Sequence, residues 1–490
     1  MQAQLDVSTR RRTLPALSGG FILRLEGSDW ASLFPRQHLM WVSPNLERVR
    51  EFTRRANQGG DEYREFLTPA MEESFSLHYR RPKPQRAARA ALVHGEILSP
   101  CICLVLTNDC NLACRYCFAS AGEAKGGVMA PEVARAAVDL AARNAVLTRM
   151  KTGRATLGVS FFGGGEPTVH WSHFQDIVEY ARASAAAHGV GVYITVTTNG
   201  QIDEDHYAWF ATHVDEVTVS MDGPAEIQNR QRCRAAGGES FRKSWSFLSH
   251  MDAAGMNISA IRATVTAESV GRMAEIAEFF WTQLGRVYPL QMEPVYFSEV
   301  GRRDCEMPRA PDFVAGLRRV EEAARARCGD RRTHGLVQTA TRPLVIRPAG
   351  SYCDAMEYDG LFVTPEGFLS QCSEVSSSDD PRAKDYFVGR YDPVAGRFQV
   401  AEQHLPGVSG GLPVRCAKCF AQFSCGGGCR PRSENAAPHI RRWWCEIIRE
   451  NLRLTWSDVR SRLQPAMAHI GDPQGEELIW LPIWTPKGKP

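Results

Sequence analysis

Hydrophobic and polar positions alternate with two periods between about residues 97 and 330. Short apolar runs rich in β-branched residues predict six strands, at 101–107, 156–162, 190–198, 216–221, 258–266 and 290–296. The segments between them place apolar residues at helical spacing, as in 131–147 and again at Met273, Ile276, Ala277 and Phe280. Six strands that alternate with helices predict right-handed βαβ units in a parallel sheet or barrel.

The flanking segments lack this alternation. Residues 1–19 are expected to be a disordered tail, and 20–96 a small N-terminal domain that ends in a basic linker. In that domain GGFILRLEG and HLMWVS predict strands and PNLERVREFTRRAN a helix. Residues 331–460 are rich in Gly, Pro, Ser and Cys, and 461–490 form a tail containing LIWLPIWTP. This tail is expected to pack against apolar surface, for which the barrel mouth is one candidate.

Composition narrows the class of protein. A chain of 490 residues is long enough for two to four domains, and 43% hydrophobic with 23% charged residues is typical of a soluble protein. The net charge of +3 is too small to indicate nucleic acid. Since the chain has neither a membrane-length apolar run nor a secretory signal, a cytoplasmic protein without membrane partners is expected. Fifteen cysteines in a reducing compartment favour metal or redox chemistry over disulfides.

Three of these cysteines directly follow the first predicted strand, in LTNDCNLACRYCF. Cys110, Cys114 and Cys117 are soft ligands suited to an iron–sulfur cluster or to zinc. A structural zinc site normally has four protein ligands, and this stretch supplies three. The fourth position is therefore either supplied from elsewhere or left open to a small molecule.

Polar and glycine residues gather at the following strand ends. The second strand ends in FFGGGEP, which offers Gly164, Gly165 and the carboxylate of Glu166. The third ends at Asn199, and the fourth in SMDG, with Ser220 and Asp222. Each motif alone reads as an ordinary turn. Their recurrence at one rim, where such folds place their chemistry, favours a binding site.

CNLACRYC and GGEP together resemble the two motifs of the radical S-adenosylmethionine (SAM) superfamily, over about residues 98–330. The resemblance implies an α/β fold with a six-stranded partial TIM barrel. It implies that Cys110, Cys114 and Cys117 hold a [4Fe–4S] cluster whose open iron binds SAM. Reductive cleavage of SAM would give a 5′-deoxyadenosyl radical that abstracts hydrogen from a substrate.

The same resemblance implies the cofactor contacts. Tyr116 would lie near the adenine, Gly164, Gly165 and Glu166 would meet the methionine amino group, and Asn199 would contact the cofactor from the next strand end. Ser220 and Asp222 would lie near the ribose or the methionine. Arg232 falls where relatives place an arginine for the methionine carboxylate, with Arg230 and Arg234 as near alternatives. Asp222, Glu293 and Tyr296 are candidate proton acceptors at strand ends, where ordinary rim residues also occur.

Seven more cysteines lie near the C-terminus: Cys353, Cys372, Cys416, Cys419, Cys425, Cys429 and Cys445. A zinc ribbon is the simpler alternative, but the spacing resembles the SPASM domain, an auxiliary-cluster extension of many radical SAM enzymes. The resemblance assigns Cys353, Cys372 and Cys429 to one [4Fe–4S] cluster and Cys416, Cys419, Cys425 and Cys445 to another. The first of these lacks a fourth cysteine. Asp354 or Glu374 could complete it, or the site could be open.

Together these resemblances imply a radical SAM/SPASM peptide maturase with three [4Fe–4S] clusters. Its expected partners are a precursor peptide, in which it would form a thioether or carbon–carbon crosslink or modify a side chain, and a reductant such as flavodoxin or ferredoxin. Oxidation of a folded protein or a small molecule is the alternative, and an iron–sulfur electron carrier or a zinc protein is the non-enzyme alternative. Sulfatase maturases carry an aspartate directly after the cysteine matching Cys372, where this chain has Ser373. The N-terminal domain could be a winged-helix module that binds the precursor by strand addition, or a structural cap.

Overall fold

The computed structural model describes residue 17 and residues 20–25, 29–34, 39–59, 61–73, 99–119, 121, 127–153, 155–296, 304–328, 337–338, 361–400, 414–425, 427–429, 432, 437–462, 469–471 and 477–480. Cys353, Asp354 and all of the predicted disordered tail at 1–19 except Leu17 lie outside the described residues. Leu17 is buried in the N-terminal hydrophobic cluster, contrary to that prediction.

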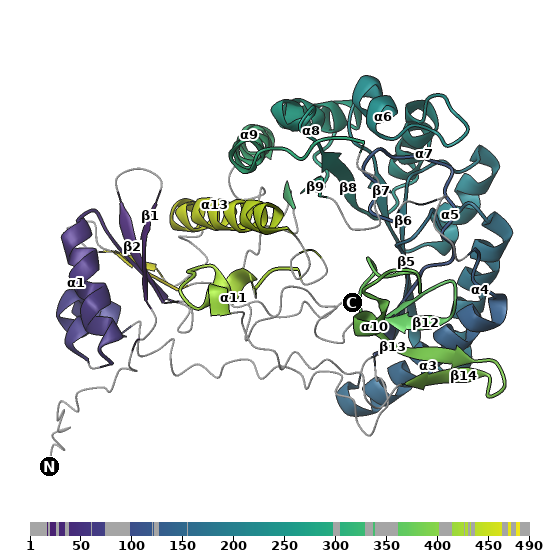
Figure 1. The fold of residues 1–490 in the computed structure, drawn as a ribbon, viewed down its shortest axis with the longest axis horizontal. Coiled ribbons are helices and arrows are strands. Elements are labelled where there is room, and N and C mark those ends of the chain that lie inside the picture. Colours follow the sequence, from purple (N-terminus) through teal and green to yellow (C-terminus); the bar gives the residue numbers. More distant parts are fainter. Residues whose placement is uncertain are drawn as a thin grey trace, which may run out of the picture.

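The six predicted strands are present and lie side by side in chain order. They are β4 (Cys101–Leu104), β5 (Thr156–Phe161), β6 (Gly191–Thr198), β7 (Glu216–Ser220), β8 (Ile258–Val265) and β9 (Leu290–Pro294), all parallel to their neighbours. The predicted partial barrel is thereby confirmed (Figure 1). Helices connect successive strands: α3 (Pro131–Thr152), α4 (Trp171–Ala187), α5 (Tyr207–His213), α6 (Ala225–Gln231), α7 (Phe241–Ala253), α8 (Met273–Gln283) and, after β9, α9 (Ala310–Cys328). Short 3-10 turns η3 (Glu204–His206) and η4 (Val270–Arg272) precede α5 and α8.

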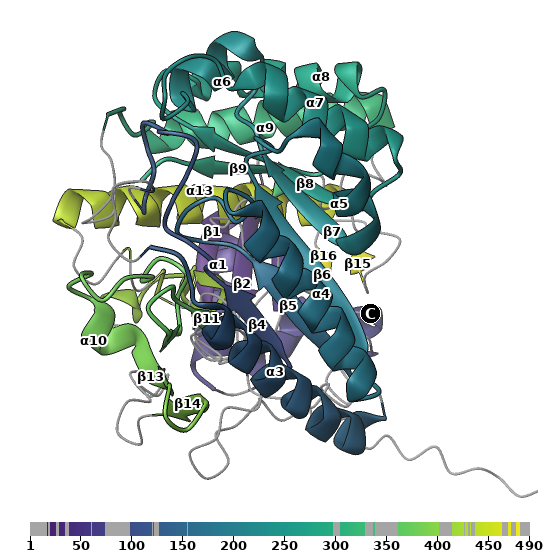
Figure 2. The same ribbon diagram turned by 90° about the vertical axis from the view of Figure 1, so that its right-hand side faces the viewer.

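The helices bury the outer face of this sheet. Figure 2 shows α3 and α4 lying along β4, β5 and β6, and α3 begins at Pro131 and ends at Gly153 in the left-handed conformation that favours glycine. On β8 the side chains of Ile261, Ala263 and Val265 are buried, whereas Arg262 and Thr264 line a cavity on the inner side. The inner face of the barrel is therefore polar enough to bind a charged molecule.

The cysteine-rich region extends the same sheet. β11 (Leu361–Val363) pairs in parallel with β4, and β12 (Phe368–Ser370), β13 (Phe387–Asp392) and β14 (Arg397–Val400) follow antiparallel. On the far side, β10 (Val337–Gln338) pairs with β9. The remaining elements are helical: α10 (Ala383–Tyr386), η8 (Val414–Cys416), α11 (Gln422–Cys425) and α13 (Pro438–Arg462). Because β11 and β12 continue from β4, Cys372 lies close to the barrel wall.

The N-terminal residues form a second sheet, with α1 (Leu46–Asn57) and η2 (Glu62–Phe66) beside it. Its strands are β1 (Phe21–Arg24), β2 (Trp30–Phe34) and β3 (Leu39–Ser43), of which β2 was not predicted. α1 begins after Asn45, whose side-chain oxygen accepts from the amides of Glu47 and Arg48 at 2.9 and 3.3 Å.

The C-terminal tail completes this second sheet. β16 (Glu477–Trp480) pairs antiparallel with β3, and β15 (His469–Gly471) pairs with β16. In the predicted tail only 469–471 and 477–480 pair with this sheet in the described structure, and residues 481–490, which include the end of LIWLPIWTP, lie outside the described residues. No helix in the described part of the chain is both long and apolar enough to cross a membrane.

One face of the N-terminal sheet packs on the cysteine-rich region. Leu23, Leu33 and Val42 share a buried cluster with Ile448 and Leu452 of α13. Figure 1 shows α13 between this sheet and the barrel, and α13 also contacts α9. Cys419 and Cys425 also pack against this cluster, so the N-terminal sheet covers part of the cysteine-rich region. A structural cap on the barrel alone would not make this contact.

Candidate functional site

The loop after β4 carries Cys110, Cys114 and Cys117 and is fixed by backbone hydrogen bonds. The amide of Ala113 donates to the Cys233 carbonyl at 2.8 Å, and that of Arg115 to the Gln231 carbonyl at 3.0 Å. The sulfurs of Cys110 and Cys117 accept from amides of their own loop, those of Leu112 and Ala121. The three cysteines are thereby held toward one cavity.

The glycines after β5 make room for this cysteine loop. The Gly165 amide donates to the Thr107 carbonyl at 2.8 Å, and the Glu166 amide to the Asp109 carbonyl at 2.9 Å. A Cβ atom on Gly165 would lie 1.9 Å from the Asp109 carbonyl oxygen, and Gly164 has a positive φ of 61°. Their glycine character is therefore required by close backbone packing, in addition to any approach of a ligand.

Glu166 is a buried carboxylate at the cavity wall. Its Oε1 accepts from the hydroxyls of Thr168 and Thr198 at 2.7 and 2.8 Å, and its Oε2 accepts from the Asn199 amide at 2.7 Å. Burial raises the pKa of Glu166, and these hydrogen bonds oppose the shift. Among the described residues, Oε2 has this one donor, so it retains a lone pair for a cation in the cavity.

Asn199 joins the third strand end to the cysteine loop. Its side-chain amide donates to Asn111 Oδ1 at 2.8 Å and to Cys110 Sγ at 3.8 Å. Its side-chain oxygen accepts from the Gln201 amide at 2.8 Å. Since both ends of the amide are engaged, Asn199 supports the first cysteine as well as lining the cavity.

Tyr116, Asp222 and Arg232 form a buried cluster. The hydroxyl of Tyr116 donates to Asp222 Oδ2 at 2.5 Å, and Arg232 Nε donates to Oδ1 at 2.9 Å. Gln231 Nε2 and the Thr264 amide also donate to this carboxylate, which is 0% exposed. Burial would lower the pKa of Arg232, but the Asp222 charge raises it, and burial raises the pKa of Tyr116. Arg232 therefore has its charge balanced within the protein.

A cavity of about 180 Å³ brings most of the predicted site residues together. Its walls include Tyr116, Gly164, Gly165, Glu166, Asn199, Ser220, Arg232, Glu293 and Tyr296 beside the three cysteines. Asp222 lies behind this wall, saturated by four donors. The geometry therefore favours a positioning role for Asp222 over the predicted ligand contact or proton acceptance.

Arg262 also lines this cavity, and the sequence reading did not single it out. It pairs in register with Ser220 on one side and Gln291 on the other, and its guanidinium lies 5.5 Å from the centre of the Phe162 ring. Burial lowers the pKa of Arg262, and Glu293 opposes that shift. No hydrogen bond to its guanidinium occurs among the described residues. One signal was available, since Arg262 alternates with apolar residues on a strand and shares the face of Thr264.

The other two candidate proton acceptors sit at the edge of the cavity nearest the C-terminal region. The guanidinium of Arg432 lies 3.6 Å from the centre of the Tyr296 ring. Burial, together with the neighbouring Glu374 carboxylate, raises the pKa of Tyr296, and the Arg432 charge opposes that shift. Arg432 also pairs with Glu374 Oε1 at 2.6 Å. Arg432, like Arg262, was missed, because its distance in sequence from the barrel hides that contact.

A second cavity, of about 130 Å³, collects cysteines of the C-terminal region. Cys416, Cys419, Cys425, Cys429 and Cys445 line it, from η8, α11, the following loop and α13. Burial, followed by the charges of Cys445 and Cys416, raises the pKa of Cys425 to about 12. Cys372 does not line this cavity. The sequence assignment of the four-cysteine set is compatible with this arrangement, and Cys353 lies outside the described residues.

The sulfurs of the described cysteines are not grouped closely enough for one zinc ion. No three cysteine sulfurs of the described residues all lie within 4.8 Å of one another. A zinc ion with Zn–S bonds of about 2.3 Å holds its sulfurs only about 3.8 Å apart. Burial raises the pKa of Cys110 to about 12 and that of Cys114 further, so these thiols lose their protons only when a cation replaces them. Three sulfurs around an otherwise open cavity suit a cluster with one free iron.

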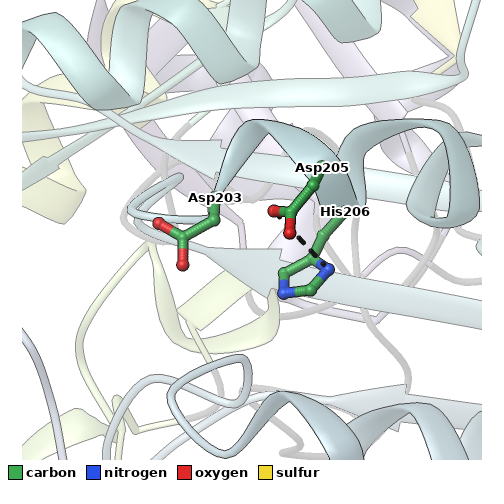
Figure 3. Close-up of side chains that lie close together, drawn as sticks. All are labelled: Asp203, Asp205 and His206. Carbon is green, nitrogen blue, oxygen red and sulfur yellow. Dashed lines mark ion pairs between the residues drawn. The ribbon is translucent and has the colours of Figure 1, made fainter.

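Asp203, Asp205 and His206 are a compact group of metal-ligand types outside these cavities (Figure 3). Asp203 accepts from Lys243 Nζ, which lowers the pKa of Asp203. His206 stacks on Trp171 with ring centroids 4.1 Å apart, and Asp205 lies 3.8 Å from its Nδ1. The surrounding side chains already account for this exposed group, so it is given no metal role.

Residues 104–280 match the Radical SAM superfamily model. Over 187 residues the chain is 32% identical to the mycofactocin maturase MftC of Mycobacterium ulcerans, covering 38% of this chain and 45% of that protein. It is 24% identical to the serine-type anaerobic sulfatase-maturating enzyme of Klebsiella aerogenes, over 68% and 79% of the two chains. The structure of native anSMEcpe with bound AdoMet superposes with a TM-score of 0.55 at 18% identity, over 74% of this chain and 99% of that one. The match to the mycofactocin maturase thus spans less than half of that relative.

Proposed function

Since the chain carries a radical SAM domain over residues 104–280, we propose that it is a radical SAM peptide maturase. The observation that carries the proposal is one cavity that joins Cys110, Cys114 and Cys117 to Glu166 and three arginines. A site that binds only a metal does not need a carboxylate and arginines in the same cavity. A ligand that carries both a positive and a negative group does need them, and SAM has an amino group and a carboxylate.

Cys110, Cys114 and Cys117 would hold a [4Fe–4S] cluster, and Asn199 and the loop amides would support their sulfurs. When bound, the cluster supplies the electron that cleaves SAM into methionine and a 5′-deoxyadenosyl radical. Oε2 of Glu166 would accept from the methionine amino group, and the burial of the cavity would keep water from the reactive species.

We assign the methionine carboxylate to Arg262 and Ser220. They are neighbours in register on β7 and β8, and both face the cavity. Arg232, the residue that the resemblance suggested, is already paired with Asp222 and lies 5.4 Å from the centre of the Tyr116 ring. It would brace the aromatic side chain expected near the adenine. Among the described residues Arg262 makes no hydrogen bond to a carboxylate, so its guanidinium N–H groups are better placed than those of Arg232 to bind the carboxylate of SAM.

Arg262→Gln is expected to weaken SAM binding by about tenfold to a hundredfold, the loss of a charge-assisted hydrogen bond. Affinity for decarboxylated SAM should stay within about twofold of the parent, since that compound lacks the group that Arg262 contacts. Isothermal titration of the reconstituted protein measures both. Arg232→Gln serves as the matched variant and should weaken both compounds alike. If Arg232→Gln, and not Arg262→Gln, weakened the binding of SAM while leaving that of decarboxylated SAM unchanged, the carboxylate would be assigned to Arg232 instead.

The C-terminal cysteines would hold two auxiliary clusters. Cys416, Cys419, Cys425 and Cys445 suffice for a closed one. Cys372 and Cys429, together with Cys353, would hold the other, and the buried carboxylate of Glu374, two residues after Cys372, is a candidate for its fourth ligand. The barrel cavity reaches Tyr296 and Arg432, so a substrate radical would form on the side that faces this region.

A precursor peptide is the proposed substrate, with an acidic electron carrier as the reductant. Co-expression with the precursor peptide is expected to give a product that has lost the mass of two hydrogen atoms, as a crosslink requires. One hydrogen atom leaves with the 5′-deoxyadenosyl radical, and the other leaves as a proton and an electron, which an auxiliary cluster would accept. Mass spectrometry of the peptide checks this, with Cys114→Ala as the inactive control. Unchanged peptide alongside SAM cleavage would point to a different substrate class.

A further inference from the structure

A groove of about 550 Å³ on the outer side of α13 is strongly basic. We define the arginine groove by Arg415, Arg441, Arg442, Arg449 and Arg453, which line it together with two glutamates, Glu446 and Glu450. One of these, Glu450, is already paired with Arg453. The whole chain has a net charge of only +3, so this is a local concentration of positive charge.

The helical period places this charge beside the second cysteine cavity. Trp444, Ile447, Ile448 and Leu452 form the buried stripe of α13. Arg441, Cys445 and Arg449 follow one another at intervals of four residues on a different stripe, and all three line both the groove and the cavity. Arg449 also hydrogen-bonds to Cys419. The groove therefore borders the sulfurs that the proposed function gives to a closed auxiliary cluster.

We propose that the arginine groove docks a small acidic one-electron carrier protein of the flavodoxin or ferredoxin kind. The inference rests on the proposed function and adds the place where electrons cross the protein surface. Charge complementarity selects the occupant, because an acidic surface would be attracted to this face, and steered association speeds encounter. A carrier seated here would bring its redox group beside Cys445. The reduced carrier would give up one electron and become oxidised, and the cluster held by the C-terminal cysteines would take up that electron and pass it to the cluster at which SAM is cleaved.

The test uses charge reversal in the full reconstituted chain and a purified acidic flavodoxin and ferredoxin as probes. Arg442→Glu replaces a positive charge of the groove by a negative one, and Glu446→Lys does the reverse. Both residues are exposed, and neither lines the cysteine cavity. At low salt Arg442→Glu is expected to weaken binding of the carrier by about tenfold and Glu446→Lys to strengthen it, and both effects should shrink at high salt. Arg242→Glu, an exposed arginine on the outer helix α7, should leave binding unchanged.

Binding and chemistry separate the two proposals. SAM cleavage driven by dithionite, which needs no docking, should be equal in the parent and the groove variants. Cleavage driven by the reduced carrier should follow the binding order. Equal carrier affinity in the parent, Arg442→Glu and Glu446→Lys, or no binding of either carrier by the parent, would overturn the docking proposal. Absence of dithionite-driven cleavage in the parent would count against the proposed function, and the affinities would still decide the docking site.

Discussion

Asp222→Asn is expected to destabilise the folded protein by about 3–5 kcal/mol, the usual result of removing one partner from a buried ion pair. The Asp222 carboxylate is fully buried and accepts from four donors, including Arg232 Nε and the Tyr116 hydroxyl. Asparagine is nearly the same size but neutral, so Arg232 would remain charged and unbalanced in a buried site. The variant also places an amide N–H or a weaker acceptor against several of the four donors.

Denaturant unfolding followed by tryptophan fluorescence measures this loss against Asp203→Asn. Asp203 pairs with Lys243 on the surface, where its side chain is 70% exposed, so its variant should stay within about 1 kcal/mol of the parent. Asp222→Asn that unfolds at the same denaturant concentration as the parent would mean that the cluster around Asp222 does not hold the cavity wall. If Asp222 were instead a proton acceptor, its variant would lose activity and keep its stability.

Cys114→Ala is expected to remove the iron of the first site and to abolish SAM cleavage. Its sulfur is one of three that face the cavity beside Glu166, and no other cysteine lines that cavity in the described structure. With the three proposed clusters, the iron content should fall from about twelve to about eight atoms per chain, one [4Fe–4S] cluster fewer. Cys419→Ala should also lose iron but keep some cleavage, because its sulfur belongs to the second cavity.

Iron content and 5′-deoxyadenosine after dithionite reduction distinguish these two variants. Equal cleavage by Cys114→Ala and the parent would refute the cofactor site. Complete loss in both variants would show that the two cavities do not act independently, as a shared unfolding of the cysteine sites would produce.

The sequence was sufficient to predict the barrel because both of its periods are local. Strand β8 and helix α8 each show their pattern within a dozen residues, and parallel connections of this kind leave few alternatives. The neighbourhood of the cysteine loop and Glu166 was predictable for the same reason, since successive parallel strands end at one rim. The pairing of Tyr116 with Asp222 was not, because the direction of a rim side chain depends on packing that neither motif encodes.

The rest depends on contacts between distant residues. β16 pairs with β3 across more than four hundred residues of sequence, and a three- to five-residue apolar run carries no signal of its partner. Arg432 reaches Tyr296 in the same way. Arg262 could have been predicted from the sequence, because a buried charge is stable only beside an opposite charge or a polar cavity. A single arginine on the inner face of a predicted barrel strand therefore indicates a binding site as strongly as the motifs at the strand ends do.

The central claim is that the cavity beside Cys110, Cys114 and Cys117 cleaves SAM. The most direct test is anaerobic incubation of the iron-reconstituted full chain with SAM and dithionite, followed by chromatographic measurement of 5′-deoxyadenosine. The account predicts 5′-deoxyadenosine and methionine in equal amounts from the parent protein, and neither from Cys114→Ala. A parent protein that holds its full complement of iron, binds SAM and forms no 5′-deoxyadenosine would contradict it.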